Sequence, residues 1–487
     1  MRILLASPES RVWNSRAHIH MGLGYLAGSL LAAGYSDLYL YDAAVEEHEQ
    51  SIADLLQREH FDVVGISSPT PLIEHAWAAA SAAKAHGAVT ILGGPHLTLM
   101  PDESMQHPEV DLVVRGEGES TLVEILHMLE RDPGVWASGE ARQFKDAGWK
   151  DILGLSWRDG EGRVRHNLDR PLRPDIDNIP YPAHHLYKIE RYTNLQPLTD
   201  GLDPHARAYT IVTSRGCPYK CTFCSKLITG DTWRPRSVEN VIGEWRMLVK
   251  DLRATEIGVT DDIWNLNLPR AKELCRALID EKLNKVPWVT VHGMKVNHTD
   301  PELFRLMKAA GCKRVGFGVE SGNEQILKQV VRKSQTLDMV RAAFRNAKQA
   351  GLQTMGFFIF GMPFETERSM EDTIRFALEL DPDLANFMIA APYPGTELWK
   401  LVEREGIRFS HTWDDYAIHA DKAHFQVGQL KAELVERKWH EAYRRFYLRP
   451  TRLARRVLMA DTWRNLPWRA RDALRFFANG RATQTEV

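Results

Sequence analysis

The sequence predicts an α/β protein with an N-terminal doubly wound parallel sheet, a partial (β/α)6 barrel and a helical C-terminal tail. Over residues 1–140, short apolar runs alternate with helical patterns, which indicates a parallel sheet covered by helices on both faces. Over residues 205–425, six strand-like runs recur, each followed by a helical pattern, as in TIM-type barrels. The chain has 487 residues, 44% hydrophobic and 26% charged, which is ordinary for a folded protein of about two to four domains.

The first region resembles a flavodoxin-like sheet. Its predicted strands are residues 2–8, 37–43, 63–69, 89–95 and 112–117, and its clearest helices are 22–33 and 73–86. Ligands of such sheets bind outside the carboxyl ends of the strands, and glycines there let a bulky ligand approach the backbone. The candidate cofactor contacts at these ends are Ser67, Ser68, Thr70, Gly93, Gly94, Pro95, His96, Gly116, Glu117 and Gly118.

A dinucleotide loop is the competing interpretation of this region. Gly22 and Gly24, with Asp42 some twenty residues on, partly match its glycine pattern. That motif should follow its strand at once, whereas about a dozen residues intervene here and the third glycine is misplaced. The sequence therefore favours another ligand.

Residues 141–204 are predicted to connect the two sheets. Residues 155–164 indicate a hairpin with Asp159-Gly160 near its tip, and residues 175–182 form an extended linker interrupted by prolines. No chemistry is assigned to this connector.

Three cysteines, Cys217, Cys221 and Cys224, follow the first barrel strand in the pattern C-x-x-x-C-x-x-C. Thiolates hold iron–sulfur clusters, and three of them leave one iron of a four-iron cluster open to another ligand. A zinc site usually shows a second pair of ligands, but the remaining cysteines, Cys275 and Cys312, stand alone. Five cysteines without a disulfide framework suit a reducing cytoplasm.

The barrel strands are predicted at residues 208–214, 256–261, 288–294, 314–320, 354–361 and 386–392. Their carboxyl ends, where barrel enzymes place their chemistry, carry further polar groups. The candidates are Asp261 and Asp262, Glu320 and Ser321, and Gly361. Each is also compatible with a solvated turn or a helix cap.

These motifs resemble the cobalamin-dependent (class B) radical S-adenosylmethionine (radical SAM) family. The resemblance implies that the three cysteines hold a 4Fe-4S cluster whose open iron binds the amino and carboxylate groups of S-adenosylmethionine. One electron then cleaves the cofactor to a 5′-deoxyadenosyl radical. It further implies that Phe223 belongs to the cluster motif, that Glu320 and Ser321 meet the ribose and methionine portions, and that residues 356–365 lie near the adenine.

The resemblance also implies cobalamin in residues 1–140. The D-x-H-x-x-G motif is absent, so no histidine of that motif ligates cobalt, and His96 is either a cobalamin contact or a loop histidine. The family includes radical SAM methyltransferases and the anaerobic magnesium-protoporphyrin monomethyl ester cyclase.

The leading function implied is cobalamin-dependent methyl transfer to an unactivated carbon. Radical cyclisation or another rearrangement of a porphyrin-like or lipid substrate is the alternative, and a non-catalytic iron–sulfur sensor is a third. A tRNA methylthiotransferase is disfavoured because no cysteine precedes Cys217. Expected partners are a small-molecule or lipid-like substrate and an electron donor such as flavodoxin or ferredoxin. Tyr393, at the end of the sixth barrel strand, faces either substrate or the core.

Residues 426–487 form a basic helical tail. Residues 437–481 hold 13 Lys and Arg against three Asp and Glu, a net charge of +10 in a chain of net charge −2. Aromatic side chains alternate with the arginines, so the tail either caps the barrel, binds an anionic membrane surface, or, least favoured, binds RNA. With no apolar run of membrane-spanning length and a strand predicted from residue 2, we expect no signal peptide and a cytoplasmic protein, with peripheral binding to the inner membrane face as the alternative.

Overall fold

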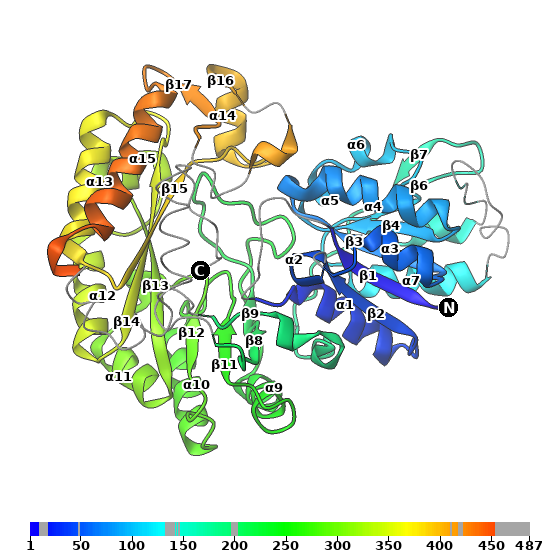
Figure 1. Cartoon of the computed structure of the whole chain (residues 1–487), viewed down its shortest axis with the longest axis horizontal. Coiled ribbons are helices and arrows are strands. Elements are labelled where there is room, and N and C mark those ends of the chain that lie inside the picture. Colours follow the sequence, from blue (N-terminus) through cyan, green and yellow to red (C-terminus); the bar gives the residue numbers. More distant parts are fainter. Residues whose placement is uncertain are drawn as a thin grey trace. The chain divides into compact units, whose positions relative to one another are not determined.

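The computed structural model describes residues 1–8, 18–46, 49–131, 142, 144, 147–195, 203–409, 412–416 and 422–452. The chain divides into two compact units (Figure 1). The N-terminal unit comprises Met1–Arg191 and Lys226–Arg234, and the C-terminal unit comprises Tyr192–Ser225 and Pro235–Val487. Among the described residues, no helix combines the length and hydropathy needed to cross a membrane.

The N-terminal unit contains a seven-stranded sheet in the order β2-β1-β3-β4-β5-β6-β7. Its first five strands run parallel, and the order 2-1-3-4-5 is that of flavodoxin-like sheets, as predicted. The parallel strands are β1 (Ile3–Ser7), β2 (Leu38–Asp42), β3 (Val63–Ser67), β4 (Val89–Gly93) and β5 (Leu112–Val114).

The hairpin predicted at residues 155–164 forms and extends this sheet. Strands β6 (Leu155–Arg158) and β7 (Val164–His166) pair antiparallel, and β6 pairs antiparallel with β5. The Asp159 carboxylate closes the turn by accepting hydrogen bonds from the backbone N–H groups of Glu161 and Arg163, at 3.0 and 2.9 Å. The first compact unit therefore continues to Arg191, through most of the segment that the sequence suggested as a connector.

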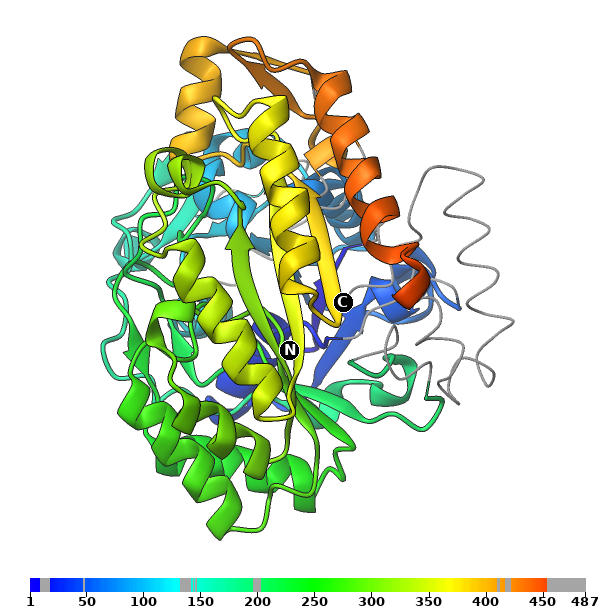
Figure 2. The same ribbon diagram turned by 90° about the vertical axis from the view of Figure 1, so that its left-hand side faces the viewer.

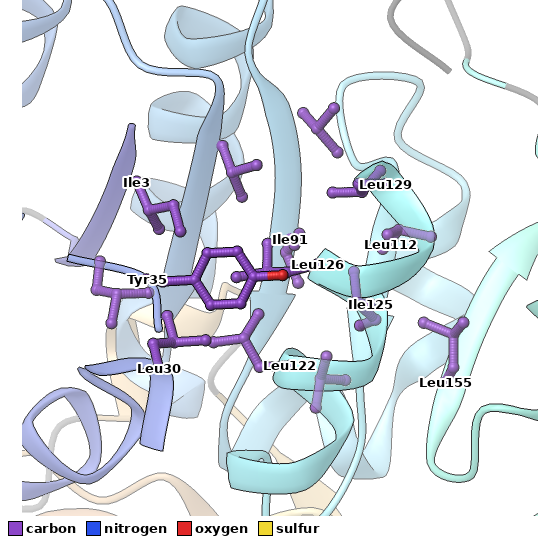
Figure 3. Close-up of a cluster of buried hydrophobic side chains, with 14 of the residues drawn as sticks. Ile3, Leu30, Tyr35, Ile91, Leu112, Leu122, Ile125, Leu126, Leu129 and Leu155 are labelled. Atoms are coloured by element: carbon purple, nitrogen blue, oxygen red, sulfur yellow. The ribbon is translucent and has the colours of Figure 1, made fainter. Parts of the chain in front are cut away.

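Helices cover both faces of this sheet, and its core lies between the strands and two long helices. Figure 3 shows the α1 and α7 side of this core, where Leu30 and Tyr35 lie beside leucines of α7, next to Ile3 and Ile91 of the strands. Burying each such aliphatic side chain contributes about 1.5–3 kcal/mol. The helices are α1 (Met21–Ala32), α2 (Ala43–Glu46), α3 (Ile52–Arg58), α4 (Ile73–Ala85), α5 (Pro95–Leu99), α6 (Pro101–Met105) and α7 (Glu119–Arg131).

The C-terminal unit contains six parallel strands in chain order, β15-β14-β13-β12-β11-β8. Because β8 and β15 are edge strands, the described residues form an open barrel rather than a closed one. The strands are β8 (Ala208–Ile211), β11 (Glu256–Val259), β12 (Trp288–Thr290), β13 (Cys312–Glu320), β14 (Gln353–Phe360) and β15 (Leu384–Ile389). Two short strands, β9 (Ser214–Arg215) and β10 (Arg234–Pro235), form a separate sheet.

Each helix that follows a barrel strand begins at a side-chain cap. The cap residue accepts a hydrogen bond from a backbone N–H of the first turn, as Ser237, Asn267, Asp300, Thr336, Thr366 and Thr396 do. The helices are α9 (Val238–Lys250), α10 (Leu268–Asp280), α11 (Pro301–Ala309), α12 (Leu337–Gln349), α13 (Glu367–Leu380) and α14 (Glu397–Glu405).

Helix α15 (Ala432–Tyr447) lies beside α13 and covers the free edge of β15 (Figure 2). The Trp439 indole N–H donates to the Phe387 carbonyl at 2.7 Å, and the Tyr447 hydroxyl donates to the Ala385 carbonyl at 2.8 Å. The aromatic face of this part of the tail is thus a cap on the barrel. Residues 453–487, with the remaining aromatic and basic side chains, lie outside the described residues.

Candidate functional site

The cysteine loop leaves β9 at the carboxyl end of the barrel. Cys217 and Cys221 are half-buried and Cys224 is exposed, whereas Cys275 and Cys312 are buried in the fold. The loop begins at Gly216, whose φ of +83° suits glycine, and the Gly216 N–H donates to Asp262 Oδ2 at 2.9 Å. One loop therefore presents three thiols that are at least partly accessible.

The middle of this loop is tied to the opposite side of the barrel. The Thr222 N–H donates to the Val331 carbonyl at 3.2 Å, and the Thr222 carbonyl accepts from the Leu398 N–H at 2.9 Å. Phe223 packs against an apolar cluster that includes Val331 and Leu398. Phe223 therefore anchors the loop, which is a role that its place in the motif did not reveal.

Charged groups gather around Cys221. Burial raises the pKa of the Cys221 thiol, while the ammonium groups of Lys333 and Lys295 act in the opposite direction. Burial also lowers the pKa of Lys295 to about 8, against the attraction of Cys221. Cationic neighbours favour the thiolate, which is the form that binds iron.

The Lys295 ammonium lies 3.1 Å from the ring centroid of Tyr219, inside the cysteine loop. Its backbone is fixed by Asn265, whose side-chain oxygen accepts from the Lys295 N–H at 3.0 Å. The Tyr219 hydroxyl is hydrogen-bonded to His298 Nε2. The sequence alone did not identify Lys295 or Lys333 as neighbours of the cysteines, because no spacing rule links either residue to them.

Among the described residues, no three His, Cys, Asp or Glu side chains are placed to share one metal ion. In a four-iron cluster each thiolate binds a different iron atom, so such a cluster does not require the three sulfur atoms to meet at one point. The soft thiol donors and the adjacent ammonium groups fit an anionic iron–sulfur cluster.

The two predicted residues after β13 already have protein partners. Glu320, in a left-handed conformation with φ of +65°, accepts a hydrogen bond from Lys333 Nζ at 2.6 Å. The Ser321 hydroxyl lies 3.2 Å from that of Thr373. A Cβ at Gly318 would lie 2.4 Å from Lys333 Nζ and 2.5 Å from Glu320 Oε1, so a side chain there would displace this ion pair. Glycine thus allows this buried ion pair.

Asp261 and Asp262 shape the strand ends. Asp261 is buried and accepts hydrogen bonds from the Thr213 N–H, the Thr213 hydroxyl and the Ser214 hydroxyl, each at 2.6 Å. Burial raises its pKa to about 6, against these hydrogen bonds. The three hydrogen bonds to Asp261 therefore order the entrance to the cysteine loop, while Asp262 holds Gly216.

The turn after β14 contains an incompletely paired carboxyl group. Gly361 has φ of +79° and touches α15, since a Cβ there would lie 2.9 Å from Val435 Cγ1. Glu365 is 4% exposed, and its Oε2 accepts from the Met362 N–H at 3.0 Å, while its Oε1 has no hydrogen-bond partner among the residues that the structure describes. Burial raises the pKa of Glu365 to about 8. A buried carboxyl group with a raised pKa thus lies in the segment predicted to be near adenine.

Tyr393 is held by the fold. Its hydroxyl donates to the Tyr416 carbonyl at 2.5 Å, and burial raises its pKa. This contact favours the packing role over the substrate-facing one.

In the N-terminal unit, the predicted loops after β3, β4 and β5 come together. The Ser68 N–H donates to the Gly93 carbonyl at 2.9 Å. The Thr98 hydroxyl donates to the Gly94 carbonyl at 2.9 Å and accepts from the Gly116 N–H at 3.0 Å. Gly94 has φ of +105°, and a Cβ there would lie 2.9 Å from the Ser68 backbone. The close approach of these loops explains the glycine, and such an edge fits a large planar cofactor.

His96 is buried in the first turn of α5, next to Pro95, rather than in a loop. Its Nδ1 lies 3.3 Å from the Thr70 hydroxyl, and its Nε2 lies 3.1 Å from Glu103 Oε2. Both ring nitrogens therefore have partners within the unit.

Glu117 and Gly118 have other neighbours. Both Glu117 oxygens accept hydrogen bonds from the Arg234 guanidinium, at 3.0 and 2.7 Å. A Cβ at Gly118 would lie 3.2 Å from Leu26 Cδ2. Glu117 is thus part of an ion pair that sequence reasoning missed, because its partner lies 117 residues away.

Comparison with known proteins identifies both regions. A family model described as the Radical SAM superfamily matches residues 211–377, and a B12 binding domain model matches residues 16–126. An uncharacterised methyltransferase of Pyrococcus horikoshii is 34% identical over 446 residues, which cover 91% of this chain and 89% of that protein. The anaerobic magnesium-protoporphyrin IX monomethyl ester cyclase of Cereibacter sphaeroides is 28% identical, over 92% of this chain and 69% of its own length.

The fold is shared with TsrM from Kitasatospora setae, a radical S-adenosylmethionine methyltransferase solved with cobalamin and a 4Fe-4S cluster bound. The TM-score is 0.66 at 19% identity, covering 84% of this chain and 80% of that one. The chain is therefore an enzyme of the cobalamin-dependent radical SAM family, with a 4Fe-4S cluster, S-adenosylmethionine and cobalamin as its cofactors.

Proposed function

We propose that this enzyme transfers a methyl group from S-adenosylmethionine to an unactivated carbon of a small-molecule substrate. When bound, the cluster supplies the electron that cleaves S-adenosylmethionine, and cobalamin carries the methyl group. The methyltransferase name of the 34% identical relative supports this reaction. The observation that carries it is the loop of three thiols at the carboxyl end of the barrel, with two buried lysines acting on Cys221.

The residue roles follow from this placement. Cys217, Cys221 and Cys224 hold the cluster, and Lys295 and Lys333 offset its negative charge. The loops that contain Ser68, Gly94 and Gly116 hold cobalamin by shape, since they meet mainly through backbone groups and the charge of Glu117, which follows Gly116, is offset by Arg234. These assignments are proposals that rest on the contacts described above.

For S-adenosylmethionine, Glu320, Ser321 and the turn from Gly361 to Glu365 lie at neighbouring strand ends. Hydroxyl and carboxyl groups suit a ribose and a zwitterion, and the apolar cluster beside Phe223 suits a flat base. Because Glu320 is already paired with Lys333, we propose that the pair acts on the cofactor as a unit.

The test uses S-adenosylmethionine with a deuterated methyl group, added to reconstituted enzyme and a small-molecule extract under anaerobic, reducing conditions. Flavodoxin or ferredoxin with its reductase is the proposed electron donor. Methyl transfer predicts a deuterated product with release of both S-adenosylhomocysteine and 5′-deoxyadenosine. Release of neither compound would contradict an enzymatic role under these conditions and favour the sensor.

Radical ring formation is the second candidate, favoured by the match to the cyclase over 92% of this chain. Its substrate would be porphyrin-like or otherwise large and apolar. Cyclisation predicts 5′-deoxyadenosine without a deuterated product, so the same experiment separates the two reactions.

A further inference from the structure

The segment that follows the cysteine loop belongs to the other compact unit. The C-terminal unit includes residues up to Ser225, directly after Cys224, and resumes at Pro235. The intervening Lys226–Arg234 is part of the N-terminal unit. The chain therefore enters the cobalamin-type unit at the exit of the proposed cluster motif and leaves it after nine residues.

Arg234 fixes this segment in the N-terminal unit. Its two terminal nitrogens donate to the two Glu117 oxygens, and they also donate to the carbonyls of Arg173 and Thr229, both at 2.9 Å. The side chains of Arg234 and Glu117 are only 3% and 10% exposed. A forked, buried pair of this kind has strict geometry, which lysine cannot fully reproduce. Glu117 directly follows Gly116 of the loop after β5.

Gly230 shows how closely the segment packs. Its φ is +77°, and a Cβ on it would lie 2.2 Å from Leu172 Cδ1 in the same unit. A side chain at this position would need a strained left-handed backbone and a shift of the Leu172 side chain, so glycine suits this packing.

Arg236 fixes the chain in the C-terminal unit only two residues later. Its Nη1 donates to Glu244 Oε2 at 2.5 Å and to the Val212 carbonyl at 2.8 Å. Both side chains are buried. Pro235, between the two arginines, restricts the backbone because its ring fixes φ. Two buried arginine pairs, one in each unit, thus flank a stiff residue.

We propose that Arg234-Pro235-Arg236 is a staple that couples the cobalamin loop after β5 to the loop that holds the cluster. Arg234 is the positioning residue of this device. Any ligand that orders the Glu117 loop also restrains the exit of the cysteine loop, and the effect is reciprocal because binding free energies are linked. The inference rests on the proposed cluster at Cys217, Cys221 and Cys224.

The test measures the rate at which an iron chelator removes iron from the reconstituted full-length protein, with and without hydroxocobalamin. For the unaltered protein we expect cobalamin to slow iron loss by about tenfold, a typical size for coupling between sites. Arg234→Ala should reduce the ratio of the iron-loss rates without and with cobalamin to near one, while the protein still incorporates a cluster. Arg234→Lys should restore part of the cobalamin effect, since lysine keeps the charge but cannot donate to both Glu117 oxygens in the same geometry.

The matched control is Arg142→Ala. Arg142 is also buried and donates to the Ala88 carbonyl at 2.7 Å in the same unit. It pairs at 2.7 Å with Asp111, which directly precedes β5, whereas the partner of Arg234, Glu117, follows β5. Arg142→Ala should keep the full cobalamin effect. Loss of the effect in this control would mean that general destabilisation explains the result, and the proposal would be overturned.

Glu117→Gln provides a second variant if Arg234→Ala does not fold, because it removes only the charge. It should also lose most of the cobalamin effect, and retention of the full effect would overturn the staple. A separate outcome concerns the cluster site itself. If the protein with all three loop cysteines changed to Ala still incorporates a full cluster, the proposed function fails, whereas absent coupling in a fully loaded protein refutes only the staple.

Discussion

The carboxyl edges of the two sheets are built in opposite ways. In the N-terminal unit, the loops at Ser68, Gly94 and Gly116 meet through backbone groups and one threonine hydroxyl. In the C-terminal unit, the corresponding edge gathers ionisable side chains, with Lys295 and Lys333 acting on Cys221. The first edge suits a large cofactor held by shape, and the second suits a compact anionic group held by charge. One chain thus uses the same strand–helix arrangement for two different kinds of recognition.

The largest effect should come from the loop cysteines. Changing Cys217, Cys221 or Cys224 to Ala should abolish both the cluster absorbance and the cleavage of S-adenosylmethionine, because each thiol is proposed to bind a separate iron atom. Changing Cys275 or Cys312 to Ala should leave both intact, since these thiols are buried elsewhere. If a variant that lacks one of these three cysteines still assembles a full cluster, cluster binding does not require all three thiols.

The shape-based edge should be sensitive to bulk. Gly94→Trp forces a side chain into a left-handed position against the Ser68 backbone, so it should weaken corrinoid binding by about 100-fold or more. Absorbance titration with hydroxocobalamin measures the affinity. Gly87→Trp is the control, because Gly87 has φ of +85° and open space around it. Equal losses in both variants would point to unfolding rather than to the loop.

The next prediction concerns the buried carboxyl group of Glu365, at the carboxyl end of the barrel strands. Below a pH of about 4.5 its carboxyl group is protonated in both the folded and unfolded states, and between about 4.5 and 8 only the unfolded state ionises. Folded wild-type protein should therefore lose stability as pH rises through this range, by about 1.4 kcal/mol per pH unit at most.

Glu365→Gln removes that loss, so its thermal midpoint relative to wild type should rise from pH 5 to pH 8. Glu397→Gln serves as the control, because Glu397 lies on the surface beside Lys400 and its pKa is lowered. A constant difference between Glu365→Gln and wild type across the range would show that the carboxyl group is not desolvated.

Removing a charge near the cluster should have a smaller effect. Lys295→Met should make the reduction potential of the cluster more negative by about 60 mV, the equivalent of a tenfold change in a one-electron equilibrium. Redox titration followed by spin resonance measures it. The potential of Lys295→Arg should stay near that of wild type. An unchanged potential in Lys295→Met would show that the charge of Lys295 does not act on the cluster.

The smallest expected effect concerns the tail. Residues 453–487 still contain seven arginines against three acidic residues, and each basic residue near an anionic surface contributes about 1 kcal/mol. Full-length protein should float with anionic liposomes at low salt and detach as salt rises. The truncated control should end at Arg452 rather than near Glu436, because α15 caps β15. If the full-length protein stays in the soluble fraction at low salt, the tail does not bind anionic membranes, and capping of the barrel is its remaining role.

Most strands were predictable from the sequence because their apolar runs and following turns are local signals. The strands predicted at residues 63–69 and 89–95 correspond to β3 and β4 to within two residues. The site was less predictable, because its key contacts join distant positions. No local pattern connects Glu117 with Arg234, or Cys221 with Lys333. Asp261 is a residue type that often binds ligands, but here its carboxylate accepts hydrogen bonds from neighbouring residues of the protein.

The closure of β15 by α15 has a consequence for self-association. An exposed strand edge offers unpaired N–H and C=O groups to the strands of other chains, and proteins usually cover such edges or place charges on them. Here the indole of Trp439 and the hydroxyls of Tyr443 and Tyr447 occupy backbone groups of Ala385 and Phe387, so the edge is blocked by side chains. Loss of this helix would leave a strand able to pair with a second molecule, which makes α15 a safeguard against edge-to-edge aggregation.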